Sequence, residues 1–147
     1  MTILDAYAVL AYLKGERAAS EVRPLLDFAD SALTAIGLAE VLDHLVRLSG
    51  ADEEDAALDL VQLGLVDAVS VDAKIGAAAG LLRGRHYHRV SCRVSLADCV
   101  AAEVARSRRQ PVASADPHLL DVCHVEGIAV TVLTASNGSR WTPPVGL

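Results

Sequence analysis

Short apolar runs alternate with longer runs of helical periodicity along nearly the whole chain. This alternation is typical of βαβ units, in which helices pack on a parallel sheet. We therefore predict an α/β fold with strands at Thr2–Leu4, Ser31–Ala35, Leu65–Val71, Pro111–Ala115 and Ile128–Leu133. The helical runs cover Ala6–Leu13, Ala19–Ala29, Leu38–Leu48, a segment that opens at Asp52, Ala73–Leu82, Leu96–Arg106 and Pro117–His124.

The composition predicts one domain with an aliphatic core. Hydrophobic residues make up 52% of the 147 residues but aromatic residues only 3%, so Leu, Val, Ala and Ile must fill the interior. A chain of this length can bury a sizeable core without disulfides. Residues 134–147 contain Ser-Asn-Gly-Ser and Pro-Pro, which predicts an irregular C-terminal tail after a domain of residues 1–133.

Three features favour a cytoplasmic protein that does not enter a membrane. No apolar stretch reaches the roughly 18 residues that a transmembrane helix needs, and no secretory signal is visible. The cysteines Cys92, Cys99 and Cys123 are odd in number and form no C-x-x-C pair. This favours reduced thiols over a disulfide framework.

Four acidic residues stand where an α/β fold would bring their carboxylates to one rim of the sheet. Asp5 and Asp116 directly follow predicted strands, and Glu40 and Asp98 fall in the first turns of predicted helices. The carboxyl ends of parallel strands and the starts of the helices that follow them lie on the same side of the sheet. We therefore expect the four side chains to converge.

Each acid also has a purely structural interpretation. Asp5 could cap the first helix, and Asp116 before a proline is a strong N-cap pattern. Asp98 completes a Ser-x-x-Asp pattern that approximates a capping box. Glu40 could be a first-turn acid favoured by the helix dipole, or a partner of His44 one turn later. Taken together, four acids on one rim favour a site.

Carboxylates gathered at one place repel each other unless cations lie among them, so the arrangement predicts bound metal. Mg²⁺ and Mn²⁺ prefer hard oxygen ligands of this kind. Such ions activate water, orient a phosphodiester and stabilise the charge on a leaving oxygen. The pattern is compatible with one ion or with two.

The segments around the four acids resemble the four motif blocks of PIN-domain proteins. They are Ile3-Leu4-Asp5, Leu38-Ala39-Glu40-Val41, Ser95-Leu96-Ala97-Asp98 and Ser114-Ala115-Asp116. Their order and spacing, and the length of the chain, are most similar to VapC-type toxins of prokaryotic toxin–antitoxin pairs. The similarity extends from Met1 to about Leu133, which is nearly the whole chain.

The resemblance implies a three-layer α/β/α sandwich around a mostly parallel sheet of about five short strands. It also implies an endoribonuclease that depends on Mg²⁺ or Mn²⁺ and cleaves an RNA substrate. The family further suggests a homodimer that is inhibited by a cognate antitoxin. Asp5, Glu40, Asp98 and Asp116 would be the metal-binding and catalytic acids, with Glu40 acting directly or through water. Ser114 would hydrogen-bond a ligand or a water molecule.

One position departs from the family pattern. The family commonly has Thr or Ser directly after the first Asp, whereas this chain has Ala6. A hydroxyl that would orient Asp5 or a metal-bound water is therefore missing. The main alternative to an enzyme is a PIN-like module that binds RNA or protein with weakened catalysis. The presence of all four acids favours the enzyme.

A basic segment precedes the third acid, although the net charge of −6 weakens a general nucleic-acid-binding interpretation. Arginine side chains hold phosphates, and aromatic side chains stack on unpaired bases. The segment is therefore a candidate RNA-binding loop, and the structural alternatives are a solvated loop or arginines that pair with acids elsewhere. The candidates are Arg83, Arg85, His86, Tyr87, His88, Arg89 and Arg93.

Two other kinds of site match the sequence less well. His118, Cys123 and His124 do not have the spacing of a standard zinc site. A phospho-acceptor receiver domain needs paired acids after its first strand and a lysine late in the chain. Here Asp5 stands alone after the first strand, and neither of the two lysines lies late in the chain.

Overall fold

A four-stranded parallel sheet forms the centre of the computed structural model, which describes residues 1–145. The strands are β1 (Thr2–Leu4), β2 (Ser31–Ala32), β3 (Val112–Ser114) and β4 (Val130–Val132), in the order β2-β1-β3-β4. Ile3 of β1 pairs with Ala32 on one side and with Val112 on the other. Because every pair is parallel, all strands end at one rim of the sheet, as the alternation of strands and helices predicted.

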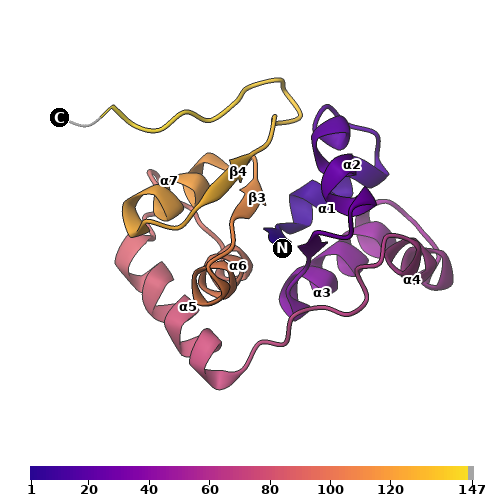
Figure 1. Cartoon of the computed structure of the whole chain (residues 1–147), viewed down its shortest axis with the longest axis horizontal. Coiled ribbons are helices and arrows are strands. Elements are labelled where there is room, and N and C mark those ends of the chain that lie inside the picture. The colour runs from indigo at the N-terminus through magenta and orange to yellow at the C-terminus, as the bar shows by residue number, and fades with distance from the viewer. Residues whose placement is uncertain (146–147) are drawn as a thin grey trace.

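Helices cover both faces of this sheet (Figure 1). They are α1 (Ala6–Leu13), α2 (Ala19–Asp27), α3 (Ala35–Asp43), a π-helical turn η1 (His44–Leu48), α4 (Glu53–Gln62), α5 (Ala73–His86), α6 (Leu96–Arg108) and α7 (Pro117–Glu126). Leu4 and Ala113 face the core formed by α1 to α4, whereas Ile3 and Val112 face α5 to α7. The result is the expected three-layer α/β/α arrangement.

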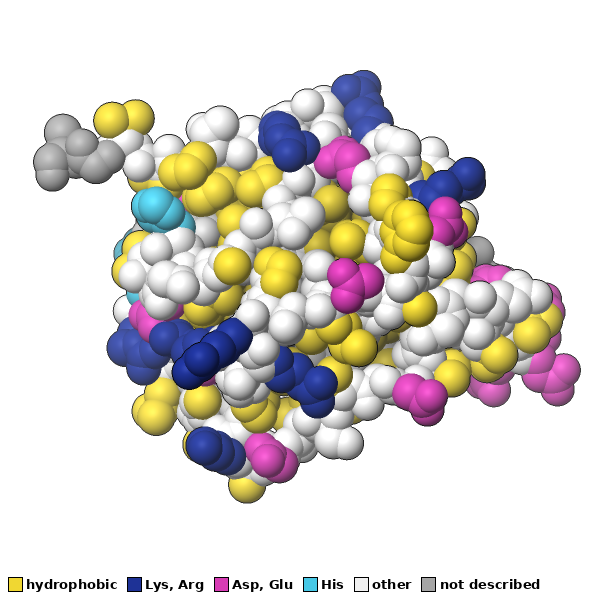
Figure 2. Space-filling model, viewed as in Figure 1, with side chains coloured by type: hydrophobic (Ala, Val, Ile, Leu, Met, Phe, Trp, Pro, Cys, Tyr) yellow, Lys and Arg dark blue, Asp and Glu magenta, His cyan; other side chains and the backbone are white. Residues whose placement is uncertain are grey.

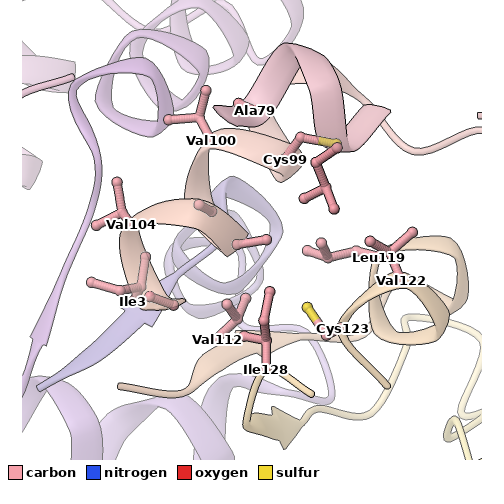
Figure 3. Packing of buried hydrophobic residues seen from close by; sticks show 14 of the residues in the cluster. Ile3, Ala79, Cys99, Val100, Val104, Val112, Leu119, Val122, Cys123 and Ile128 are labelled. Carbon is pink, nitrogen blue, oxygen red and sulfur yellow. The ribbon is translucent and has the colours of Figure 1, made fainter. Parts of the chain in front are cut away.

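The core on the second face consists of small and medium aliphatic side chains. Figure 3 shows Ile3 and Val112 from the strands beside Val104 of α6. Cys99 of α6 and Cys123 of α7 are buried free thiols of the same core. Burial raises the pKa of each thiol to about 12, so both remain protonated and act as small apolar residues.

The predicted fifth strand at Leu65–Val71 is wrong. The segment makes one isolated parallel bridge, between Thr34 and Val69, and forms no strand. Val69 donates to the Leu33 carbonyl at 2.8 Å, but the backbone around it bends and then enters α5 at Asp72. The apolar residues of this segment resemble a strand in the sequence. A segment can bury apolar side chains, however, without forming a continuous ladder of backbone hydrogen bonds.

Several helix limits also differ from the prediction. The second strand ends early because Thr34 caps α3, with its hydroxyl accepting from the Gly37 amide at 3.0 Å. Helix α2 ends at Asp27. Helix α5 continues from the predicted end at Leu82 to His86, so the first part of the basic segment is helical and is not a loop. Basic side chains in a last turn interact favourably with the helix dipole.

After β4 the chain runs without helix or strand to residue 145. This tail crosses over β4 and α7 in Figure 1. The Tyr7 hydroxyl donates to the Thr134 carbonyl at 2.9 Å, and the Trp141 indole donates to Asp121 Oδ1 at 2.8 Å. The Trp141 ring also meets His124 edge to face. Among residues 1–145, no helix has the length and apolar character that a membrane span requires.

Candidate active site

Asp5 is the most buried of the four acids. It follows β1 and caps α1, where Oδ1 accepts from the Ala8 amide at 2.9 Å. Its own amide donates to the Ala113 carbonyl at 3.2 Å, which ties it to the neighbouring strand. The residue is only 5% exposed. Burial raises the pKa of the Asp5 carboxyl to about 7, and the charges of Asp116 and Glu40 add to this rise.

Asp98 lies in the first turn of α6, as predicted. Its amide donates to the hydroxyl of Ser95, the N-cap residue, at 3.0 Å. Burial raises the pKa of Asp98 to about 8, and the charges of Asp5, Asp116 and Glu40 contribute to this rise. The fold therefore places the four acids within electrostatic range of one another, although they come from positions far apart in the sequence.

Asp116 ends the segment after β3 and caps α7. Its Oδ1 accepts from the His118 amide at 2.9 Å, and its own amide donates to the Ser114 hydroxyl at 3.0 Å. Ser114 is fully buried and also hydrogen-bonds the Asp5 carboxyl, which counteracts part of the rise in the Asp5 pKa. Ser114 thus connects two of the acids and holds them in place.

Glu40 is placed differently from the other three. Helix α3 begins at Ala35, so Glu40 lies in its second turn and not in the first turn, as predicted. The residue as a whole is exposed, but its carboxylate is partly buried. Burial and the nearby Asp43 charge raise the Glu40 pKa. His44, a potential partner of Glu40, instead hydrogen-bonds Lys14 at 2.6 Å.

The structural and functional interpretations of these acids are compatible. Asp5 and Asp116 each use one oxygen to cap a helix, which leaves the second oxygen of each carboxylate for another partner. In residues 1–145, no group of three Asp, Glu, His or Cys side chains lies in a geometry that could hold an ion directly. The hard oxygen donors nevertheless fit Mg²⁺, which keeps several waters and takes only one or two carboxylates.

The basic segment divides into two parts with different partners. Arg83 donates from Nε to the Val94 carbonyl at 2.9 Å, and its guanidinium carbon lies 4.2 Å from the centre of the Tyr87 ring. Val94 directly precedes the Ser95 cap of α6. Arg83 and Tyr87 are therefore fixed against the turn that carries Asp98.

Arg85 and His86 face Glu126, the last residue of α7. His86 Nε2 lies 2.6 Å from one Glu126 oxygen, and Arg106 and Arg85 lie 2.7 and 3.3 Å from the other. The hydrogen bond from Arg106, followed by that with His86 and the charge of Arg85, lowers the pKa of Glu126 to about 2. Figure 2 shows basic side chains gathered beside acidic ones in the region of α5. An acid at a helix C-terminus interacts unfavourably with the helix dipole. The position of Glu126 near the end of a predicted helix was therefore a sequence signal for basic partners.

The remaining members of the segment form an exposed turn. The amides of Val90 and Ser91 donate to His88 Nδ1, each at 3.2 Å, and His88 pairs with Cys92 through two backbone hydrogen bonds. His88 thus stabilises the turn. Arg89 and Arg93 are exposed, and within residues 1–145 their side chains form no ion pair.

Comparison with known proteins identifies the class to which this fold and acidic rim belong. The PIN domain family matches residues 2–125, so the chain belongs to the PIN domain family. This confirms the family that the four motif blocks indicated. No curated protein matches the chain.

Solved structures of similar fold include an RNA-loop-cleaving toxin and a toxin–antitoxin complex. FitAcB from Neisseria gonorrhoeae is 19% identical with a TM-score of 0.63, and the match covers 88% of this chain and 96% of that one. VapC20 from Mycobacterium tuberculosis, a toxin that cleaves the sarcin–ricin loop, is 16% identical with a TM-score of 0.62, covering 82% and 93%. VapBC2 from Rickettsia felis, bound to a promoter DNA fragment, is 15% identical with a TM-score of 0.62, covering 88% and 96%. At these identities the likeness establishes the shared fold.

Proposed function

We propose that the protein is a metal-dependent endoribonuclease and the toxin of a toxin–antitoxin pair. One observation carries the proposal: four acids from separate elements of a PIN fold lie together, and the pKa values of Asp5 and Asp98 rise to about 7 and 8. Buried carboxylates with raised pKa values are typical of functional sites. A divalent cation among them would remove the repulsion and keep them ionised.

Asp5, Asp98 and Asp116 would hold Mg²⁺ or Mn²⁺, with one or two of them in direct contact and Glu40 acting through water. The ion would supply a water nucleophile at neutral pH and stabilise charge on the phosphodiester. The protein provides the positioning. Ser114 and the Ala8 amide fix the Asp5 carboxyl, while the caps of α6 and α7 fix Asp98 and Asp116.

Ala6 limits this arrangement. No hydroxyl directly follows Asp5, so the Ala8 amide and Ser114 are the groups that position its carboxyl among residues 1–145. This departure supports the second candidate function, a PIN-like binding module with weakened catalysis. The two functions differ in one measurable property, which is cleavage of RNA in the presence of Mn²⁺.

The proposed partners are an RNA substrate, a cognate antitoxin and a second copy of the chain in a homodimer, all in the cytoplasm. Proteins of similar fold support the antitoxin, since they include VapBC2 and a toxin–antitoxin complex from Klebsiella pneumoniae. The latter is 16% identical to this chain with a TM-score of 0.57.

The site is tested with Asp5→Asn and Asp98→Asn, which preserve side-chain shape and remove the charge. We expect each to lower Mn²⁺-stimulated RNA cleavage by at least about 100-fold. Asp55→Asn is the matched control, since Asp55 is an exposed acid of α4. Circular dichroism checks that both site variants are folded. Undiminished RNA cleavage by both folded variants would contradict the assignment.

The toxin role is tested in cells. Expression of the chain alone should arrest growth, and co-expression of the neighbouring open reading frame should restore it. Asp5→Asn should abolish the arrest without changing the amount of protein. A chain that is harmless when expressed alone would favour the binding module.

A further inference from the structure

Three glycines lie along one face of α5. Gly76, Gly80 and Gly84 are spaced by four residues, so they form one row on the helix. Apart from their chain neighbours and the backbone of their own helix, a Cβ atom at any of the three would meet no atom of residues 1–145 within 4 Å. Packing inside the chain therefore does not require glycine there, even though glycine weakens a helix interior relative to alanine.

The last two glycines line a shallow hollow. Its lining residues are Gly80, Arg83, Gly84, Tyr87 and Leu96, and its volume is about 300 Å³. Tyr87 is 43% exposed and Leu96 is 55% exposed, so apolar side chains stand open to solvent around it. A hollow of this size is at the small end of ligand sites and suits a single small group.

The walls of the hollow present a planar cation and an aromatic ring. Arg83 lies over the Tyr87 ring, and one of its five N–H donors is bound to the Val94 carbonyl. This bond fixes the guanidinium plane, and the other donors project from it. An unpaired base stacks on aromatic rings and guanidinium planes, while arginine N–H groups bind the adjoining phosphate.

The position of the hollow relates it to the acids. Leu96 is the first residue of α6, and Asp98 lies two residues later in the same turn, on another side of the helix. The acidic rim alone repels RNA phosphates, so an RNA strand needs a cation beside it. Arg83 supplies a cation next to the start of α6, whereas Arg85 and His86 are turned toward Glu126.

We propose that this hollow binds one unpaired base of an RNA strand, with Arg83 on the adjoining phosphate, and so holds the strand at the turn of α6 that carries Asp98. The inference rests on the proposed ribonuclease function and adds to it a binding site for one base of the substrate. Arg83 and Tyr87 are then substrate-binding residues, and Arg85 and His86 are structural. A second copy of the chain is the competing occupant of the glycine row.

The test places a side chain in the hollow at one of its glycines. Gly84→Leu places a side chain in it, and Gly76→Leu makes the same change two turns earlier, outside the lining. Tyr87→Ser removes the stacking ring, whereas Tyr87→Phe retains it. Binding of a fluorescein-labelled single-stranded RNA of mixed sequence is measured by anisotropy in EDTA, with Mn²⁺-dependent cleavage measured in parallel.

We expect Gly84→Leu and Tyr87→Ser to weaken RNA binding roughly tenfold, because each removes one base-stacking contact. Gly76→Leu and Tyr87→Phe should bind within about twofold of the unmodified chain. If the unmodified chain cleaves RNA and all variants bind RNA equally, the base site is overturned but the proposed ribonuclease function is not. An unmodified chain that neither binds nor cleaves overturns the proposed function itself. Loss of a dimer in Gly84→Leu on ultracentrifugation, with RNA binding unchanged, assigns the hollow to a second copy and overturns the base site.

Discussion

Two clusters of charge differ in how their charges are balanced. Around Asp98, at the start of α6, the neighbours are acids, and the Asp98 pKa rises to about 8. Around Glu126, close to the end of α6, the neighbours are Arg106, His86 and Arg85, and the Glu126 pKa falls to about 2. The first cluster is a repulsion between like charges, and the second is a network of ion pairs.

This difference separates a site from a structural network. Carboxylates that repel one another destabilise the folded chain unless an outside cation joins them, so selection for stability alone would not gather them. Carboxylates surrounded by cations stabilise the fold without an outside group. The contrast leads to four predictions, and each asks whether one of these clusters behaves as its charges require.

Adding metal should have the largest effect. A ligand present at 100 times its dissociation constant stabilises the folded state by about 2.7 kcal/mol. We expect saturating Mn²⁺ to raise the free energy of unfolding by roughly that amount in urea denaturation. Asp98→Asn should lose most of this gain, and Asp55→Asn, on the surface of α4, should keep it. A Mn²⁺ response that is equal in all three proteins would place the metal elsewhere.

Removing one acid should stabilise the metal-free chain. Folding raises the pKa of Asp98 from 3.8 to about 8, so the folded state binds more protons between these values. Stability should therefore fall as the pH rises from 4 to 8 and then level off. In EDTA at pH 8, we expect the free energy of unfolding of Asp98→Asn to exceed that of the unmodified chain by about 2 kcal/mol. The advantage should vanish near pH 4. A less stable variant at pH 8 would contradict the repulsion.

Glu126→Gln should have the opposite sign. The Glu126 pKa falls from 4.5 to about 2 in the folded state, so its contribution is present above pH 4.5 and lost as the pH falls toward 2. Its side chain is 15% exposed, so some screening applies, and we expect a loss of about 1.5 kcal/mol at pH 7. Urea denaturation of both proteins at pH 7 and pH 2.5 gives the difference. A loss that does not depend on pH would indicate a packing effect instead.

Arg85→Gln should have the smallest effect. Arg85 is 53% exposed and lies at the edge of the network, 3.3 Å from Glu126. Exposed ion pairs contribute little, so we expect a change of about 0.5 kcal/mol or less in the free energy of unfolding. Arg106→Gln, at the shorter 2.7 Å contact, should cost more. If Arg85→Gln were as destabilising as Arg106→Gln, the shorter Arg106 contact would not be the main interaction of Glu126.

Much of the fold follows from local sequence patterns. The strand at Thr2–Leu4 and the helix from Ala6 to Leu13 have the limits that the sequence predicts. Their signals are local, since apolar runs and capping residues act on their own segments. The prediction at Leu65–Val71 was wrong because a strand depends on a partner ladder, which periodicity alone does not reveal.

The sequence predicts which residues belong to the candidate site better than it predicts how they are arranged. The chain order of strands and helices is enough to place Asp5, Asp98 and Asp116 on one rim. That Ser114 is fully buried and connects Asp5 to the Asp116 backbone does not follow from its position in the chain. Nor does the second-turn position of Glu40, which depends on the capping role of Thr34.

The sequence by itself determined the class of fold and which acids end at one rim, because strand ends and helix starts are encoded locally. Only the tertiary structure decided which charges meet. Arg83 and Arg85 are two residues apart on one helix, yet one faces the turn before Asp98 and the other faces Glu126, 41 residues away in the chain. The physical reason is that electrostatic partners are chosen by packing in space, across separations that no local pattern can encode.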